Sequence, residues 1–526
     1  MAGNDGRPLG RIDIAALVGV LVLGGLVRLI GLPARGMWDA DQGHDMLVLA
    51  AFVQHGAVPL LGPPTSIGGL HHGALYYYLL APFAALSGAN PTAATAGIAA
   101  SGIASIGVVW WLARSIGGPI AGLVAGLLMA FSAAAIDEST FIWNPNLLDL
   151  SSSIAFAAAW QAWRRRDLRW WLVAAAGLGA TMQIHVLGAV LVVPFVGLLV
   201  ADVRRRSPGE RGRMVGVALA CVAVVAVLYA PLLAYEVGHD FAESRALVAF
   251  LTGASASGTS APNVLVRVVI VAMRVLSWPL SGLITDAPLL AILVATAVVV
   301  ALAWRLRSAA AVEREAMAWF GATLAWSILV LAVVAPTLAT VVPGLPNDHY
   351  HAYLDPIVIV IIGVGLARLL TMTLAAESLL RTWPRVLGAL GLAALVGFNV
   401  WTWPPPVSPD GGWPAAENAS REILTTLGNR DFVLLGIPAF KPTDAIGFPL
   451  NHLGRPPSPA SADDVVDRST AVVVVCDRLF ETVVGAPCGG PAEQAALSGF
   501  APLSLVRRIE VSARTVVSIY AASDAA

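Results

Sequence analysis

With 57% hydrophobic and only 12% charged residues, this 526-residue chain is too apolar for a water-soluble protein, because soluble domains are about half apolar and about a quarter charged. Most of its length is therefore expected in a membrane. Its net charge of −1 gives no basis for a nucleic-acid partner. Its three cysteines show neither a CxxC motif nor the Cys/His spacing of a metal site.

The first apolar run, 14–32, predicts a membrane-spanning helix rather than a cleavable signal peptide. Arg7 and Arg11 precede it, and no small-residue cleavage site follows it. At about 1.5 Å per residue, its length is sufficient for the apolar core of a bilayer. We expect an anchor whose N-terminus is cytoplasmic.

Arginine positions predict which of the later apolar segments cross the membrane, because cytoplasmic loops are enriched in arginine. The arginine clusters lie at 7–11, 114, 164–169, 204–213, 305–314 and 381–385. They can all be cytoplasmic along one path, an all-α polytopic domain of eleven crossings with the C-terminus outside. The crossings fall near 13–32, 92–113, 118–136, 146–163, 170–183, 185–202, 214–234, 286–305, 315–338, 353–373 and 384–402.

Two apolar segments, 75–88 and 263–283, remain outside this path. If only one of them crossed, every later arginine cluster would lie on the wrong side. Arg267 and Arg274 are seven residues apart on one helical face, so we expect 263–283 to lie along the outer interface. We expect 75–88 to be a partial or re-entrant helix packed against protein. A thirteen-crossing path, in which both segments cross, is the alternative.

The composition changes after the tryptophan- and proline-rich stretch 401–406, which predicts the membrane exit and a stiff linker. We therefore divide the chain into a transmembrane domain at 1–403, a linker at 404–414 and a small soluble α/β domain at 415–526. The last is predicted to contain helices at 415–427 and 491–497 and strands at 432–437, 471–476, 503–511 and 516–521. Cys476 and Cys488 allow a disulfide in an extracytoplasmic domain; two free thiols are the alternative.

The predicted path gathers acids, histidines and aromatic residues on the outer face. They are Asp39, Asp41, His44, Asp45, His71, His72, Asp137, Glu138, Trp143, Asn144, Gln183, His185, Tyr235, Glu236, His239, Asp240, His349, Tyr350, His351, Tyr353 and Asp355. Carboxylates near a bilayer are costly and usually mark a function. Singly, each residue has a structural explanation: His185 as a helix contact, Trp143 as an interfacial anchor. Their convergence on one side predicts an active site at the membrane surface.

The order of these loops resembles the GT-C class of polyprenyl-phosphate-sugar-dependent glycosyltransferases, in particular the protein-mannosyltransferase and aminoarabinose-transferase families. The residues that carry the likeness are Asp41-Gln42, Pro59-Leu60 with Gly62-Pro63, His72-Gly73-Ala74-Leu75-Tyr76-Tyr77-Tyr78, Gln183-Ile184-His185 and His349-Tyr350. It covers roughly residues 10–400. The chain departs from the family in two places. Gln42 stands where the family has a glutamate, and Gly73-Ala74 stands where it often has Pro-Pro.

The resemblance implies a GT-C-like hexosyl- or pentosyltransferase of the bacterial inner membrane and cell envelope. The donor would be a polyprenyl-phosphate-linked sugar, and the acceptor an extracytoplasmic glycan, lipid or protein. The aspartate that deprotonates the acceptor hydroxyl in this family falls on Asp41, with Asp39 as the competing assignment. A single displacement with this base would invert the anomeric centre.

The leaving phosphate requires cationic or hydrogen-bonding ligands. We expect His349 and Tyr350 in this role, with Arg267 or Arg274 adding charge. The other candidate substrate-binding residues are His71, His72, Glu138, Trp143, Asn144, Gln183, His185, Tyr235 and Glu236. No cofactor is required. A divalent metal held by Asp41, His71 or His185 is compatible with the sequence, although no spacing demands one.

A membrane transporter or lipid flippase of the cell envelope is the alternative function. Such a protein requires polar groups at mid-bilayer depth. The predicted helices offer few, since Arg28 lies near a helix end. A non-catalytic scaffold would not need acids beside histidines. The sequence therefore favours the glycosyltransferase.

Overall fold

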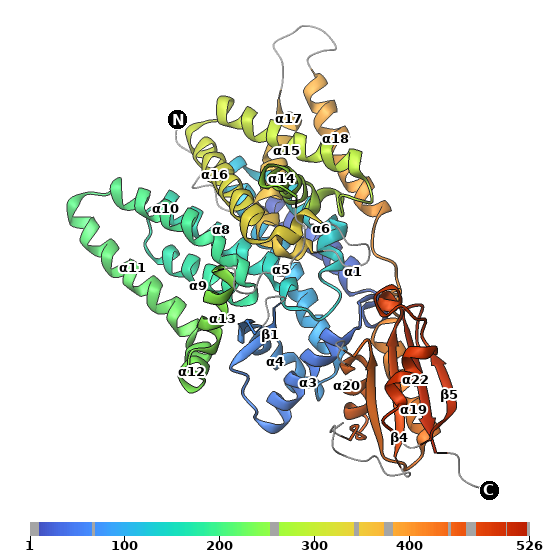
Figure 1. The fold of residues 1–526 in the computed structure, drawn as a ribbon. Coiled ribbons are helices and arrows are strands. Elements are labelled where there is room, and N and C mark those ends of the chain that lie inside the picture. Colours follow the sequence, from blue (N-terminus) through green and yellow to red (C-terminus); the bar gives the residue numbers. More distant parts are fainter. Residues whose placement is uncertain are drawn as a thin grey trace.

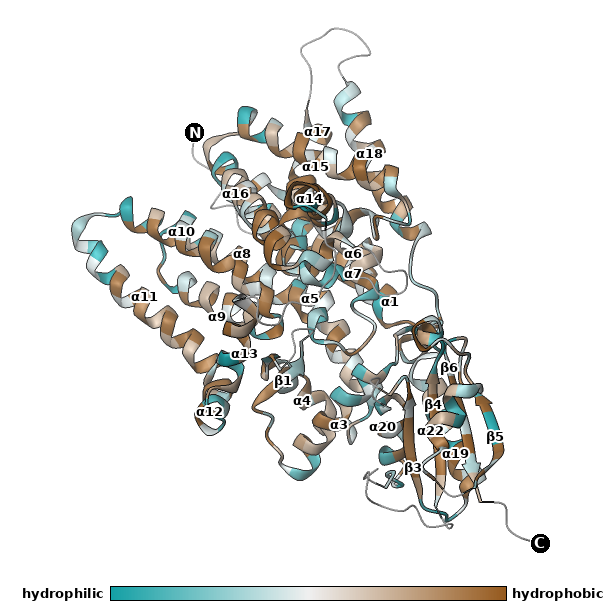
Figure 2. Cartoon of the chain, in the orientation of Figure 1, coloured by the Kyte–Doolittle hydropathy of each residue, from teal (hydrophilic) through white to brown (hydrophobic). Residues whose placement is uncertain are grey.

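The computed structural model describes residues 10–65, 69–252, 262–340, 347–372, 382–439, 443–458, 470–500 and 502–522. They form a large helical bundle and a small α/β domain, drawn in orange and red in Figure 1, at one end of the bundle. Figure 2 shows that the bundle helices are coloured mostly as hydrophobic. The prediction of an all-α membrane part followed by a small α/β part is confirmed.

The bundle contains every segment predicted to cross the membrane as a helix. Its elements are α1 (Arg11–Leu29), α2 (Leu32–Arg35), α3 (Ala40–His55), β1 (Leu61–Pro64), β2 (His71–Gly73), α4 (Leu75–Ser87), α5 (Pro91–Gly117), α6 (Pro119–Phe131), α7 (Ala133–Asp137), η1 (Asn144–Leu147), α8 (Leu148–Arg165), α9 (Arg169–Ile184), η2 (Val186–Leu191), α10 (Val192–Arg204), α11 (Pro208–Leu228), α12 (Ala230–Gly238), α13 (Ala242–Leu251), α14 (Val264–Ser281), α15 (Pro288–Ser308), α16 (Ala311–Val334), η3 (Pro336–Ala339), η4 (Asp348–Tyr350), η5 (Ala352–Leu354), α17 (Asp355–Thr371) and α18 (Trp383–Trp401). Within the described ranges, nine helices are long and apolar enough to span a bilayer.

Polar contacts identify one end of the bundle, which we call the arginine end. Arg114 at the end of α5 forms an ion pair with Asp13 at the start of α1, at 2.9 Å. Arg164 at the end of α8 donates to a carbonyl near the end of α5, and Arg206 donates to the carbonyl of Arg166 at 3.1 Å. Arginine clusters that are far apart in the sequence therefore lie together, as the predicted path requires.

The opposite end, which we call the site end, holds the residues predicted to face outward. Ring contacts join the segment before α4, the connection from α9 to η2, and the η4 helix before α17. Each of these segments is separated from the arginine end by the length of a helix, which is about 30 Å for 20 residues. The candidate residues thus share one end of the bundle.

The two segments outside the predicted path behave differently from the long helices. At 13 residues, α4 is about 20 Å long, shorter than an apolar bilayer core of about 30 Å, and it agrees with the expected partial helix. The helix α14 is a candidate span by length and composition. Its C-terminal half nevertheless contacts the site end, because Arg274 binds Asp348 before α17 and the carbonyl of Leu280 accepts from Asn399 near the end of α18.

The α/β domain is built on one four-stranded sheet of order β3-β4-β6-β5. Its elements are α19 (Gly412–Leu427), β3 (Phe432–Ile437), α20 (Asp444–His452), β4 (Ala471–Asp477), η7 (Arg478–Phe480), α21 (Glu481–Val484), α22 (Pro491–Leu497), β5 (Ser504–Glu510) and β6 (Thr515–Ala521). β3 and β4 are parallel, and the other pairs are antiparallel. The predicted strands and helices are observed, whereas α20 was not predicted.

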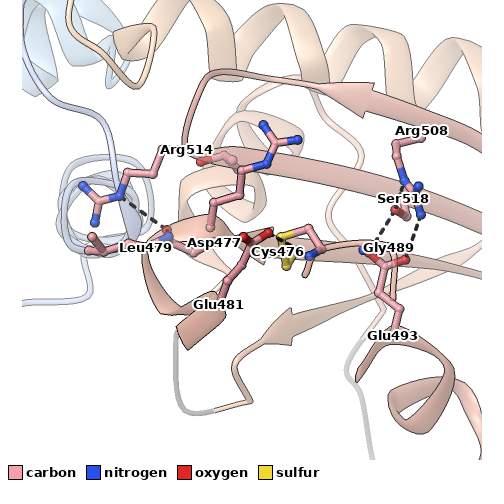
Figure 3. Close-up of a disulfide and its surroundings, with 12 residues drawn as sticks. Cys476, Asp477, Leu479, Glu481, Gly489, Glu493, Arg508, Arg514 and Ser518 are labelled. Atoms are coloured by element: carbon pink, nitrogen blue, oxygen red, sulfur yellow. Dashed lines mark hydrogen bonds and ion pairs between the residues drawn. A yellow bond between two sulfur atoms is a disulfide. The ribbon is translucent and has the colours of Figure 1, made fainter. Parts of the chain in front are cut away.

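The two faces of the sheet are covered by different helices. Alternate residues of β3 and β4 pack with α19 and α20 on one face and with the α22 region on the other. On the α22 side, Cys476 and Cys488 form a disulfide (Figure 3), the first of the two predicted alternatives. Nearby, Glu493 is buried and interacts with Arg508 and Ser518.

The α/β domain docks on the start of α3 through Trp38. The Trp38 backbone N–H donates to Asp410 at 2.8 Å, and its indole N–H donates to the carbonyl of Ala445 at 2.8 Å. Its ring lies 4.8 Å from that of Trp413, centroid to centroid. A β-carbon on Gly43 would come within 2.1 Å of the Asp444 carbonyl oxygen, so α3 and α20 are in backbone contact.

We expect Gly43→Ala to destabilise this docking, because the added methyl group meets backbone that cannot rotate away. Overpacking of this kind typically costs about 1–3 kcal/mol. The measurement is the melting temperature of the purified chain, together with the rate of proteolysis of the α/β domain. Gly19→Ala is the control, since its β-carbon would meet nothing within 4 Å. Equal stability of the two variants would contradict the close contact.

Candidate active site at the site end of the bundle

The helix α3 begins with a capping box that assigns different roles to its first polar residues. Asp39 is the N-cap and accepts from the Ala40 N–H at 2.7 Å. Gln42 accepts from the Asp39 N–H at 2.9 Å and donates to the carbonyl of Ile142 at 3.0 Å. A glutamate at this position could not donate to Ile142, which gives a structural reason for the departure from the Asp-Glu pair.

Asp41 lies on the exposed side of the first turn of α3. Asp39, the competing candidate, faces the α/β domain and lies 3.4 Å from Arg514, which also approaches Asp477 (Figure 3). His44 likewise contacts Asp444 of that domain at 3.1 Å. The domain thus engages residues on both sides of Asp41, and Asp39 has a structural role in capping and docking.

Asp45 is a buried carboxylate one turn after Asp41. It is 2% exposed, and its two oxygens accept hydrogen bonds from the hydroxyl groups of Tyr76 and Tyr77, each at 2.8 Å. Burial raises the pKa of Asp45 to about 7, although the two tyrosine hydrogen bonds oppose the shift and the nearby Asp41 adds to it. The Asp45 contacts hold α3 against α4.

Five of the predicted residues form a cluster of rings drawn from four separate segments. His185 lies 4.9 Å from His72, 5.7 Å from His349 and 5.4 Å from Tyr350, centroid to centroid. His349 in turn lies 4.4 Å from Trp143 and 4.5 Å from Tyr350. We call these five residues the histidine cluster. The sequence could place these five residues only on the same side of the membrane, whereas the structure shows that their rings are in contact.

The histidines of this cluster are neutral hydrogen-bond donors. Burial lowers the pKa of His72 to about 4 and that of His349 to about 3, and it lowers the pKa of His185 well below its usual range. Nδ1 of His72 accepts from the Val186 N–H, and Nδ1 of His185 accepts from the Leu187 N–H. The proton of each neutral ring is therefore on Nε2.

Hydrogen bonds from side-chain amides to backbone carbonyls connect the start of α3 to segments of this cluster. Gln42, which follows Asp41, is hydrogen-bonded to the carbonyl of Ile142, and Ile142 directly precedes Trp143 of the cluster. Asn144, on the other side of Trp143, donates to the carbonyl of Ile184 at 2.6 Å, which directly precedes His185. A carboxylate, neutral histidine donors and aromatic faces therefore share one region.

The two arginines predicted to bind phosphate, Arg267 and Arg274, differ in their polar contacts. Arg274 is 1% exposed, and its guanidinium makes a bidentate contact with Asp348 at 2.9 and 2.6 Å. Those hydrogen bonds and one from His351 hold the pKa of Asp348 at about 2, although burial opposes them. Arg267 is half-buried, and its Nε has no hydrogen-bond partner among the described residues. Arg274 is thus already neutralised by Asp348, whereas Arg267 forms no ion pair with an acid among the described residues.

The remaining predicted residues support the cluster or lie apart from it. His71 is held by Glu243 through its backbone N–H at 2.7 Å and its Nδ1 at 2.8 Å. Gln183 packs closely on Gly73: a β-carbon added to Gly73 would lie 1.8 Å from Oε1 of Gln183. Tyr235 stacks on His239, and buried Glu236 accepts from the Ser244 N–H, both on or beside α12. Glu138 lies in a separate carboxylate group with Asp149 and Asp355.

Sequence analysis placed Asp45 on the outer face without giving it a role, and it did not identify Glu243, Asp444 and Arg514 as parts of this region. Asp45 follows Asp41 by four residues, so the two lie one helical turn apart on α3. Glu243 lies far from His71 in the sequence, and Asp444 and Arg514 belong to a domain without a recognisable motif. No sequence pattern connects these three to the site.

Comparison of the sequence with family models gives one match within this region. Residues 71–230 match the family described as dolichyl-phosphate-mannose-protein mannosyltransferase. The matched segment includes His72, Trp143, Gln183 and His185. No curated protein sequence matches the chain.

Comparison with solved structures gives matches along nearly the whole chain. ArnT from Cupriavidus metallidurans in the apo state has a TM-score of 0.60 at 14% identity, covering 96% of this chain and 97% of that one. The same protein bound to undecaprenyl phosphate has a TM-score of 0.59 at 15% identity and the same coverage. The chain therefore has the ArnT fold, and the predicted resemblance to GT-C transferases is confirmed.

We expect the charge of Asp45 to make stability depend on pH. The pKa of an unfolded aspartate is about 3.9, whereas the pKa of Asp45 in the folded chain is about 7. Asp45 thus contributes stability that is fully present below about pH 4 and is lost as the pH rises through about 7. The melting temperature of Asp45→Asn should therefore increase relative to that of the wild type as the pH rises from about 5 to about 8. Parallel profiles for the two proteins would contradict the assignment.

Proposed function

We propose that this chain, a membrane glycosyltransferase of the GT-C class, transfers a sugar from polyprenyl phosphate to an extracytoplasmic acceptor with inversion. Asp41 acts as the general base. The observation that carries the proposal is the hydrogen bond from Gln42, which follows Asp41, to the carbonyl of Ile142, which precedes Trp143 of the histidine cluster. The bound undecaprenyl phosphate of the similar ArnT structure supports a polyprenyl-phosphate donor.

In this mechanism, Asp41 accepts the proton of the acceptor hydroxyl as the hydroxyl oxygen attacks the anomeric carbon. The bond from that carbon to the phosphate breaks on the opposite side, and the electron pair leaves with the phosphate. A carboxylate on the exposed side of α3 can be reached by an acceptor from outside the bundle. The displacement requires no cofactor, because the phosphate is already a charged leaving group.

The histidine cluster supplies the phosphate ligands. His349 and Tyr350 are the proposed contacts, and the neutral Nε2–H groups of His72 and His185 add donors that carry no charge at neutral pH. Arg267 supplies the positive charge, because Arg274 is already bound by Asp348. Hydrogen bonds from neutral groups and one cation suit a phosphate at the edge of a bilayer.

The site end is proposed to face the outside of a bacterial inner membrane, with the N-terminus in the cytoplasm. Arginines gather at the other end of the bundle, and the positive-inside rule puts that end in the cytoplasm. The α/β domain is then extracytoplasmic, in agreement with its disulfide. It contacts α3 on both sides of Asp41, so the acceptor is expected to approach along this domain.

Asp41→Asn should abolish most sugar transfer, because asparagine keeps the size of the side chain but cannot accept the proton. Loss of a positioned general base typically lowers the rate by about 10²–10⁴-fold. The measurement is turnover of a lipid-linked sugar by the purified protein. Binding of the donor should be retained, since Asp41 is not a phosphate ligand. Glu510→Gln, in the exposed edge strand β5, is the control for general effects of losing a carboxylate.

Asp39→Asn separates the two candidate bases. Asparagine is as good an N-cap as aspartate, so this variant should fold with α3 in place. If Asp39→Asn is inactive while Asp41→Asn turns over like the wild type, Asp39 is the base. If Asp41→Asn, Asp39→Asn and Asp45→Asn all remain active, the start of α3 is not catalytic and the proposed function fails.

His349→Ala should raise the Michaelis constant for the lipid donor more than that for the acceptor. A hydrogen bond to a charged group contributes about 1.5–3 kcal/mol, which corresponds to an increase of about 10- to 100-fold. Arg267→Gln should act in the same direction. An unchanged donor dependence in His349→Ala, with a large change in Arg267→Gln, would move the phosphate site away from the histidine cluster and toward α14.

A further inference from the structure

A second group of acids lies at the site end, apart from Asp41. Glu138 follows α7, Asp149 is near the start of α8, and Asp355 is the first residue of α17. One oxygen from each carboxylate lies within 4.8 Å of the others. Asp149 is 8% exposed and Asp355 is 3% exposed, whereas Glu138 is half-buried, so water screens the charges of Asp149 and Asp355 poorly. We call these three residues the carboxylate triad.

The surrounding cations do not neutralise the triad. Arg28 interacts electrostatically with Asp149, and Arg274 is committed to Asp348. Among the residues that the structure describes, no lysine or arginine forms an ion pair with Glu138 or Asp355. Two uncompensated negative charges in such a site would carry a large desolvation cost. One divalent cation, or two protons, would remove that cost.

An independent observation on His351 favours the cation. Its side chain is 0% exposed, and its Nε2 lies 3.1 Å from Asp348 Oδ1. Its other ring nitrogen, Nδ1, has no hydrogen-bond partner among the described residues and lies 3.9 Å from Asp355 Oδ1. That oxygen also lacks a hydrogen-bond partner within the described chain.

The separation between these two atoms suits a bridging ion. At 3.9 Å, the distance from Nδ1 to Oδ1 is too long for a hydrogen bond, but it suits two ligands of one cation. Metal–oxygen bonds of about 2.1–2.4 Å put opposite ligands about 4.2–4.8 Å apart, and the oxygens of the triad lie within that limit. A buried imidazole nitrogen therefore points into a set of oxygens of the right spacing.

We propose that Glu138, Asp149 and Asp355, together with Nδ1 of His351, bind one divalent cation. Three carboxylates and one imidazole favour a cation that prefers oxygen, of the Mg²⁺, Mn²⁺ and Ca²⁺ class, over one that prefers thiolate. The ion would connect α17 and the preceding η4 helix, which carries His349, to the α7–α8 segment, which carries Trp143. It has a structural role beside the histidine cluster and takes no part in the displacement at Asp41.

The test is direct binding of Mn²⁺ to the full-length protein in detergent after treatment with a chelator. We expect about one bound Mn²⁺ per wild-type chain by equilibrium dialysis, and nitrogen coupling from His351 in the electron paramagnetic resonance spectrum. Removing even a residue that only supports a metal ligand typically weakens binding 10- to 100-fold. Asp355→Asn and Asp149→Asn should weaken it by at least about 100-fold, and His351→Gln should remove the nitrogen coupling.

Matched variants distinguish the carboxylate triad from the metal site that the sequence allowed at Asp41, His71 or His185. Asp41→Asn and His71→Ala should bind Mn²⁺ like the wild type. Loss of binding in either of them, with retention in Asp355→Asn, would overturn the proposal and place the ion at the start of α3 or at β2. Absence of binding of Mn²⁺, Mg²⁺ and Ca²⁺ to the wild type at about 10 mM would also overturn it, and the triad would then hold protons.

The outcome does not depend on the proposed catalytic role of Asp41, because binding is measured without turnover. Wild-type protein alone provides the decisive measurement if a triad variant fails to fold. For variants that do fold, added Mn²⁺ should raise the melting temperature of the wild type and of His71→Ala but not that of Asp355→Asn. An equal rise in all three proteins would contradict a cation held by the triad.

Discussion

The contact of Asp45 with Tyr76 and Tyr77 determines where the proposed base lies. This carboxylate is buried, so its hydrogen bonds are costly to lose and hold α3 against α4. Asp41 is one turn earlier on the same helix. From the other side, Trp38 and Gly43 join α3 to the α/β domain. The position of Asp41 is therefore set by two packed interfaces rather than by a free loop.

Burial assigns different roles to acids that look alike in the sequence. Asp39 caps a helix and approaches Arg514, whereas Asp41 lies on the exposed side of α3. Asp348 is neutralised by Arg274. Glu138 and Asp355 form no ion pair with an arginine or lysine among the described residues. In a medium of low dielectric constant, an acid keeps its charge only beside a compensating partner, so its neighbours decide what each carboxylate can do.

Much of the architecture followed from patterns along the chain. Apolar run lengths predicted the bundle helices, and arginine positions predicted that 164–166 and 204–206 share one end, where Arg206 indeed meets Arg166. Runs of β-branched residues predicted β3, β4, β5 and β6. The helix α20 was missed because its sequence, interrupted by Pro449, shows no clear helical periodicity. That helix makes the main contact between the α/β domain and α3.

The sequence by itself determined the membrane class, the helices, the two chemically different ends and the histidines of the site end. These properties depend on composition and on local periodicity, which can be read without knowing how the helices pack. Only the tertiary structure decided that His72, His185 and His349 meet, that Arg274 is bound by Asp348, and that Glu138, Asp149 and Asp355 form a triad. Such pairings join residues up to about two hundred positions apart, and their energies depend on separations of a few ångströms in a buried environment. No pattern along the chain specifies those distances.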